Sequence, residues 1–231
     1  MTLADNLATV RQRLTAACEA CDRNPTAVRL IAVSKEQPVD LALAAHDLGV
    51  EDFGENTAQG LAEKAEEFAR RGRVARWHFI VHLQRNKVNT VLRHATMVHS
   101  VDRFDLAQAL AKRAPSGGLT VLVQVNIGRE QQKGGVDPDQ SLALASEVAR
   151  LEGLHLAGLM GIPPAGVDPA PFFKELAALS QALQQSPAGT AARELSMGMS
   201  QDFVVAIRYG ATMVRVGTAI FGERTGQGVG P

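Results

Sequence analysis

The chain of 231 residues has little cysteine, no net charge and no long apolar run, and each absence excludes a class of protein. Its 24 lysines and arginines balance 24 aspartates and glutamates, so the overall charge does not favour a nucleic acid or an anionic membrane as partner. No apolar stretch approaches the roughly 18 residues that span a bilayer, and the first residues lack the basic-then-apolar order of a secretory signal. We therefore expect a cytoplasmic protein that binds neither nucleic acid nor membrane.

The chain has only two cysteines, which cannot cross-link a fold of this size. Cys18 and Cys21 have the C-x-x-C spacing of some metal sites, but they lie in a predicted helix. No second pair of cysteines or histidines follows at zinc spacing, and the six histidines are scattered along the chain. We therefore predict no metal site.

Hydrophobic periodicity predicts alternating strands and helices along nearly the whole chain. Apolar residues three or four apart from Leu3 to Ala17 predict an amphipathic helix, which ends at Asn24-Pro25. Eight short apolar runs then alternate with helical stretches, and every run but the last is followed by a helix. The predicted strands cover 28–34, 52–53, 77–81, 97–101, 119–125, 154–160, 194–197 and 213–216. The later helices begin near Pro38 and cover 57–71, 84–93, 103–113, 138–150, 169–185 and 201–208.

Strands that alternate with helices pair in parallel through right-handed crossovers. Eight such units close a (β/α)8 barrel, so we predict an α/β fold of this TIM-barrel type with an extra N-terminal helix. A doubly wound open sheet shows the same alternation and stays the main alternative. No linker divides the chain, so we expect one domain over residues 1–222 and a flexible tail over 223–231.

In such a barrel, functional residues lie at the carboxyl ends of the strands. Lys35 directly follows the first predicted strand, where apolar neighbours would keep its amine partly desolvated and able to attack a carbonyl. The alternative is a lysine that extends from the strand end into solvent. The loops after the last two strands contain Ser200, Gly217 and Thr218, which offer hydroxyl and backbone N–H groups to a phosphate.

Arg215 lies in the last predicted strand, where its permanent charge requires either a ligand or an internal ion-pair partner. An arginine beside the pyridine nitrogen is one way in which proteins tune pyridoxal phosphate. Asn56, after the second strand, can orient a ligand through its amide. His78 and His82 are as consistent with core residues as with functional ones. The methionines of the predicted strands are expected in the core: Met97, Met160 and Met213.

A series of short motifs, in a fixed order, resembles one family closely. The motifs are VSK at 33–35, GEN at 54–56, WHFI at 77–80, HSVDR at 99–103, LSMGMS at 195–200 and MVRVGTAIFG at 213–222. In these motifs the chain is similar to the pyridoxal phosphate homeostasis proteins, relatives of the N-terminal barrel of bacterial alanine racemases. Two departures lie near the expected cofactor: residues 57–60 read TAQG instead of an aromatic and a Gln-Glu pair, and Val81 replaces a common glycine.

The resemblance implies a (β/α)8 barrel that takes pyridoxal 5′-phosphate as its cofactor. Lys35 would hold it as a reversible aldimine, which is a Schiff base. Arg215 would face the pyridine nitrogen, and Asn56 would line the pocket. The phosphate would be held by Ser200, Gly217 and Thr218.

The function implied is intracellular homeostasis of this cofactor, with no catalytic residue. Alanine racemases pair the cofactor lysine with a tyrosine from a second, all-β domain, whereas the single tyrosine here, Tyr209, falls on a helix far from the barrel mouth. We expect a monomeric carrier whose partners are pyridoxal phosphate and apo-enzymes that depend on it. Two alternatives stay open: a small amino-acid racemase that uses Lys35 with His78 or a water as second base, and a barrel for another phosphorylated metabolite.

Overall fold

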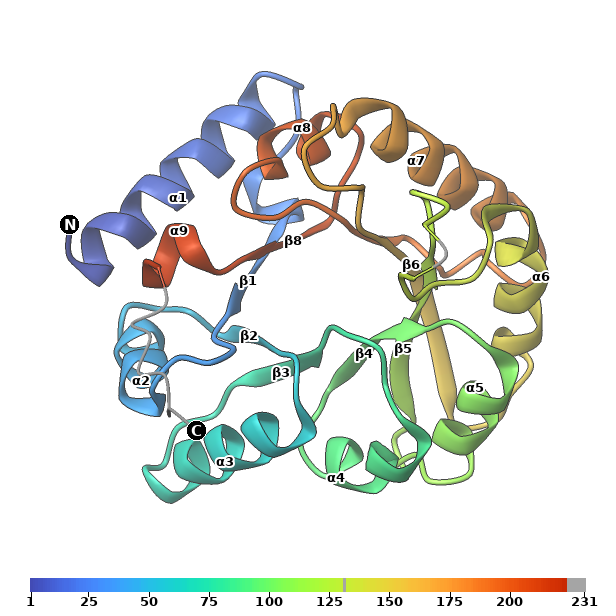
Figure 1. Cartoon of the computed structure of the whole chain (residues 1–231), viewed down its shortest axis with the longest axis horizontal. Coiled ribbons are helices and arrows are strands. Elements are labelled where there is room, and N and C mark those ends of the chain that lie inside the picture. The colour runs from blue at the N-terminus through green and yellow to red at the C-terminus, as the bar shows by residue number, and fades with distance from the viewer. Residues whose placement is uncertain (131, 224–231) are drawn as a thin grey trace.

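The computed structural model describes residues 1–130 and 132–223, and its strands close into a parallel barrel (Figure 1). The strands follow the order of the sequence, and residues 29–32 of the first pair with residues 213–216 of the last. They are β1 (Arg29–Val33), β2 (Asp52–Glu55), β3 (Arg76–Phe79), β4 (Met97–Val101), β5 (Leu119–Val125), β6 (Leu154–Gly161), β7 (Glu194–Ser196) and β8 (Met213–Val216). The predicted (β/α)8 fold is confirmed, and the open-sheet alternative is wrong because β8 pairs with β1.

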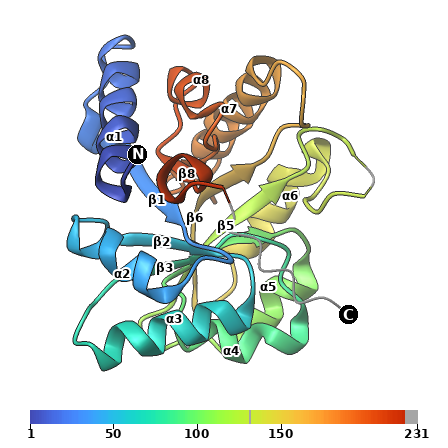
Figure 2. The same ribbon diagram turned by 60° about the vertical axis from the view of Figure 1, so that its left-hand side comes forward.

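Helices surround the barrel, and α1 packs beside α8 and α9, next to the seam between β8 and β1 (Figures 1 and 2). The helices are α1 (Leu3–Glu19), α2 (Val39–Asp47), α3 (Ala58–Arg70), α4 (Val88–Leu92), α5 (Phe104–Ala111), α6 (Pro138–Ala149), α7 (Ala170–Gln185), α8 (Phe203–Arg208) and α9 (Thr218–Phe221). Short 3-10 turns occupy Pro25–Ala27 and Arg85–Lys87, so the helix predicted from 84 is shorter than expected. The prediction that no helix follows the last strand is wrong: α9 forms one turn that buries Ile220.

Strand residues alternate between the helices and the barrel axis, and each side has its own apolar core. Between strands and helices, Phe53, Phe68 and Trp77 form an aromatic cluster with ring centroids 5.1–5.3 Å apart. Along the axis lies a smaller buried cluster of Ile31, Met97, Leu122, Met160 and Met213. The expected core position of the three methionines is therefore confirmed. Buried polar side chains share the barrel interior with this cluster and form part of the site.

The described residues contain neither a membrane-spanning helix nor a metal-binding cluster. No helix among the described residues is long and apolar enough to cross a bilayer. The same part of the chain has no group of three histidine, cysteine or acidic side chains placed to hold a metal ion, and Cys18 and Cys21 are free thiols. Apart from Glu223, the predicted tail lies outside the described residues.

Candidate functional site

The strand ends place the predicted site residues at one mouth of the barrel. Lys35 and Asn56 follow β1 and β2, while Gly217 and Thr218 follow β8, and these three strands are neighbours in the sheet. Ser200 joins them from the loop after β7, which pairs with β8. The six predicted residues, including Arg215 within β8, thus come from four adjacent strands.

Lys35 lies in a tight turn that leaves β1. The Gln37 N–H donates to the Ser34 carbonyl (3.0 Å), and Glu36 adopts a left-handed conformation with φ 60°. The Lys35 side chain is half-buried and has no hydrogen-bond or ion-pair partner among the described residues. Its amine is therefore available to a ligand at the mouth.

A buried ion pair directly behind this turn fixes its position. The Lys64 ammonium donates to Glu55 Oε1 (2.7 Å) and to the Ser34 carbonyl (3.0 Å), while the Ser34 hydroxyl donates to the same carboxylate (2.7 Å). Glu55, Lys64 and Ser34 are all buried, so each group depends on the others for its hydrogen bonds. Sequence reasoning missed Glu55 and Lys64, although an acid at the end of an apolar strand signals a buried partner.

Backbone N–H groups converge at the start of α9. The N–H groups of Gly217 and Ala219 both donate to Ser200 Oγ, each at 3.3 Å. A Cβ on Gly217 would lie 3.2 Å from the Val33 carbonyl oxygen, so glycine permits this close approach of β8 to β1. Thr218 is exposed at the first helical position, and its hydroxyl adds a further donor. These groups together suit an anion with several acceptor oxygens.

Arg215 reaches from β8 into the barrel interior. Its Nη1 donates to Ser196 Oγ (2.6 Å) and its Nη2 to the Gly161 carbonyl (3.1 Å). Both partners are neutral, and no ion pair to Arg215 occurs within the described part of the chain, so the internal ion-pair alternative is wrong. Burial lowers the pKa of Arg215 to about 10. A guanidinium has five N–H donors, so this one retains donors for a ligand.

Below Arg215, a row of buried polar groups continues to the opposite end of the barrel. His99 lies 3.0 Å from Ser196 Oγ through Nδ1 and 2.9 Å from His78 Nδ1 through Nε2. His78 Nε2 lies 2.8 Å from Asp52 Oδ1, and Arg76 donates to both oxygens of that carboxylate (2.9 and 2.7 Å). Both ring nitrogens of His78 are thus engaged inside the barrel, away from the mouth.

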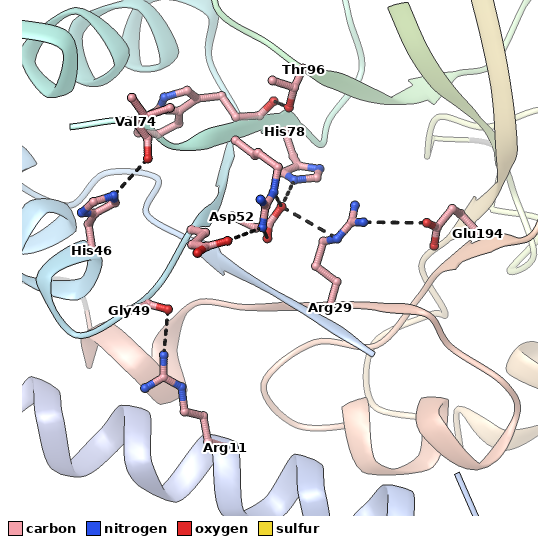
Figure 3. A network of polar contacts seen from close by, with 12 residues as sticks. Arg11, Arg29, His46, Gly49, Asp52, Val74, His78, Thr96 and Glu194 are labelled. Atoms are coloured by element: carbon pink, nitrogen blue, oxygen red, sulfur yellow. Dashed lines mark hydrogen bonds and ion pairs between the residues drawn. The ribbon is translucent and has the colours of Figure 1, made fainter. Parts of the chain in front are cut away.

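Burial and the hydrogen bonds at the lower end of the row together set the protonation of its members. Burial of Asp52 opposes ionisation, but hydrogen bonds from His78 and Arg76 outweigh it and lower the pKa to about 2. Burial lowers the pKa of His78, and lowers that of His99 well below its ordinary value. Figure 3 shows this end, where Arg29 extends from Asp52 toward Glu194.

The far side of the mouth carries further polar groups. His82, which is exposed, lies 3.0 Å through Nδ1 from Asp102 Oδ2. Near the carboxyl ends of β4 and β5, the buried atoms Ser100 Oγ and Gln124 Oε1 have no partner among the described residues. The sequence analysis gave no role to Asp102 or Gln124, although Asp102 lies in the HSVDR motif at 99–103.

The two departures from the family motifs have structural roles. Thr57 is the N-cap of α3, and its Oγ1 accepts a hydrogen bond from the Gly60 N–H (3.0 Å). Gly60 has no room for a side chain, because a Cβ there would lie 2.9 Å from Thr57 Oγ1. Val81 packs, half-buried, against the outer apolar core.

A closed parallel barrel with a lysine after its first strand and an arginine inside its last belongs to the class of the alanine racemase N-terminal domain. The model of the family "Alanine racemase, N-terminal domain" matches residues 3–225. The alanine racemase from Corynebacterium glutamicum shares the fold with a TM-score of 0.69, at 18% identity over 98% of this chain and 64% of that one.

Within this class, the chain belongs to the family of pyridoxal phosphate homeostasis proteins. The Pseudomonas aeruginosa protein of that name is 42% identical over 96% of both chains. The structure of PipY from Synechococcus elongatus PCC7942 with PLP bound has a TM-score of 0.83 and 33% identity, and the match covers 96% of this chain and 100% of that one. The resemblance drawn from the motifs is thus confirmed.

Proposed function

We propose that this chain binds pyridoxal 5′-phosphate at the barrel mouth and takes part in homeostasis of the cofactor by holding and releasing it. The observation that carries the proposal is the amine of Lys35, which has no partner within the described residues and shares one mouth with the converging N–H groups of Gly217 and Ala219 and with the buried guanidinium of Arg215.

The residues present fit this cofactor in three respects. Ser200 and Thr218 offer hydroxyl donors to a phosphate, and beside them lies the N–H of Gly217, which donates to Ser200 Oγ at 3.3 Å. Arg215 has N–H groups to spare for a ring nitrogen. The buried Ser100 Oγ near the same mouth lacks a hydrogen-bond partner within the described residues, as expected where a polar ligand completes the site.

Bound pyridoxal phosphate supplies an aldehyde carbon, to which a primary amine bonds reversibly with loss of water. Lys35 provides that amine, and the ion pair of Glu55 and Lys64 holds its turn in place. Arg215 can only donate hydrogen bonds, so it opposes protonation of the ring nitrogen and weakens the ring as an electron sink. Asn56 follows β2, the neighbour of β1, so its amide would line the same mouth and orient the ring.

We further propose that the protein is a monomeric, cytoplasmic carrier rather than an enzyme, and that apo-enzymes receive the cofactor from it. A racemase needs two acid–base groups. Both ring nitrogens of His78 form hydrogen bonds in the barrel interior, and Tyr209 directly follows α8 in the helix layer. These positions support a carrier, because neither side chain lies beside Lys35.

Replacement of Lys35 by alanine tests the cofactor assignment. Wild-type protein incubated with pyridoxal phosphate and then borohydride should retain a stable adduct, and Lys35→Ala should retain none. Lys174→Ala, which removes an exposed lysine from α7, is the matched control and should label like wild type. An undiminished adduct in Lys35→Ala would overturn the assignment.

Exchange at the α-carbon of amino acids separates a carrier from an enzyme. Fully loaded protein should incorporate no deuterium into alanine or serine over hours. Exchange that is lost in His82→Asn would contradict the carrier proposal and identify the pair of His82 and Asp102 as the acid–base group.

A further inference from the structure

Five buried side chains form an unbroken hydrogen-bonded row along the barrel interior. They come from five different strands, and each is at most 4% exposed: Arg215, Ser196, His99, His78 and Asp52. The row begins with a cation beneath the proposed cofactor site and ends with an anion at the opposite rim. Four hydrogen bonds of 2.6–3.0 Å connect these two charges.

The chemistry of the two ends determines the direction of every bond between them. Arg215 can only donate, so Ser196 Oγ accepts from it and is left with its own proton to donate. The acceptor within reach is His99 Nδ1, so His99 carries its proton on Nε2 and donates to His78 Nδ1. His78 then carries its proton on Nε2 and donates to the Asp52 carboxylate.

The opposite direction fails at the carboxylate. If His99 donated from Nδ1 to Ser196, its Nε2 would have to accept from His78 Nδ1. A neutral His78 would then present a bare Nε2 lone pair to Asp52 Oδ1 at 2.8 Å, which is repulsive. A doubly protonated His78 would avoid the clash, but burial disfavours that charge and lowers its pKa.

Charged groups approach the row from several elements. On the strands or next to them are Arg29 of β1, Glu51 and Asp52 at β2, Arg76 of β3, Glu194 of β7 and Arg215 of β8, while Asp202 precedes α8. Glu51, Asp52 and Glu194 lie at the lower rim, where Asp52 ends the row, whereas Asp202 lies in the loop after β7 at the mouth end. On the mouth side of the two imidazoles lies the positive charge of Arg215, which further disfavours protonation of His99 to a cation.

We propose that His99 and His78, both neutral and protonated on Nε2, are positioning residues that hold Arg215 in place through Ser196 and couple it to the Asp52 carboxylate. This inference rests on the proposed function, because Arg215 acts on a cofactor only if one binds above it. Nη1 of Arg215 is then committed to the row and Nη2 to the Gly161 carbonyl, which leaves the other N–H groups of the guanidinium for a ligand.

The first test uses the protein without cofactor and does not depend on the proposed function. Histidine ring 15N chemical shifts at neutral pH should place the proton of both His78 and His99 on Nε2, with Nδ1 as acceptor. A proton on Nδ1 of either ring, or a doubly protonated ring, would overturn the row as drawn.

The second test interrupts the row at the hydroxyl. Ser196→Ala removes the link between Arg215 and His99, whereas Ser196→Thr keeps a hydroxyl there. Ser141→Ala, which removes a buried hydroxyl from α6 outside the barrel, is the matched control. In each protein, the affinity for pyridoxal phosphate and the pH dependence of its visible absorption are measured.

The proposal expects Ser196→Ala to bind pyridoxal phosphate about tenfold more weakly, the effect of one lost buried hydrogen bond, and to show a new pH-dependent absorption change. Ser196→Thr and Ser141→Ala should match wild type. A Ser196→Ala protein with wild-type affinity and pH profile would overturn the proposal. A wild-type protein that takes no borohydride label would instead overturn the proposed function, and the ring-nitrogen shifts would still decide the row.

Discussion

Mild acid should weaken this fold through the two histidines inside the barrel. Burial lowers the pKa of His78 and of His99, so both rings stay neutral in the folded protein where an unfolded histidine takes up a proton. The unfolded chain then binds more protons than the folded one, and the free energy of unfolding falls as the pH drops below about 6.5. Between pH 7.5 and 5, each ring that stays neutral costs about 2 kcal/mol.

Other groups contribute differently to this window. The pKa of Asp52 is lowered to about 2, so the stability that Asp52 contributes is present above about pH 4 and is lost between about pH 4 and pH 2. The decrease in the free energy of unfolding between pH 7.5 and 5 therefore reports on the histidines and not on Asp52. For His78 and His99 together it amounts to at most about 4 kcal/mol, a large part of the stability of an ordinary domain.

Urea denaturation followed by the fluorescence of the single tryptophan, Trp77, measures this loss. His99→Gln should lose a large part of the pH dependence, because burial lowers the pKa of His99 well below its ordinary value and that ring is gone. The exposed His155 offers a matched control, and His155→Gln should keep the full slope. A flat profile in the wild type, or a full slope in His99→Gln, would refute the reasoning.

Two further predictions concern groups around the mouth. Lys64→Ala leaves the buried Glu55 carboxylate unpaired, so urea denaturation should show a free energy of unfolding about 3–5 kcal/mol lower. The control Lys174→Ala removes an exposed lysine and should change that free energy by under about 0.5 kcal/mol. Equal effects of the two substitutions would exclude Glu55 and Lys64 as the support of the Lys35 turn. Gly217→Ala adds a Cβ 3.2 Å from the Val33 carbonyl oxygen and should therefore shift the N–H groups at the phosphate site. Equilibrium dialysis should then show about tenfold weaker binding of pyridoxal phosphate. The control Gly117→Ala adds a Cβ that meets nothing within 4 Å, and this variant should bind like wild type.

The barrel could be predicted from the sequence because buried parallel strands are short apolar runs separated by amphipathic helices. The predicted strand at 97–101 coincides with β4, and that at 213–216 with β8. The helix after β8 was missed because α9 has only four residues, too few to show a helical period. Closure of the barrel rests on hydrogen bonds between the first and last strands, which repeat counting cannot distinguish from an open sheet.

The site was predictable where residues lie next to each other in the chain and not where they meet across strands. Lys35 and Gly217 stand directly after strands, so their position at the mouth follows from the fold. The row from Arg215 to Asp52 depends on strand register, which brings His78 and His99 to adjacent heights in the barrel. No spacing in the sequence indicates that register, and Arg215 was therefore expected to need a ligand or an acid rather than the hydroxyl of Ser196.

The assignment of Lys35 as the amine that holds pyridoxal phosphate at the mouth of the barrel can be tested directly. The most direct measurement is the visible absorption spectrum of the wild-type protein incubated with pyridoxal phosphate, before and after borohydride, followed by peptide mass mapping of the reduced adduct. We expect a yellow protein whose label lies on Lys35. A colourless protein that stays unlabelled, or a label on another lysine, would contradict it.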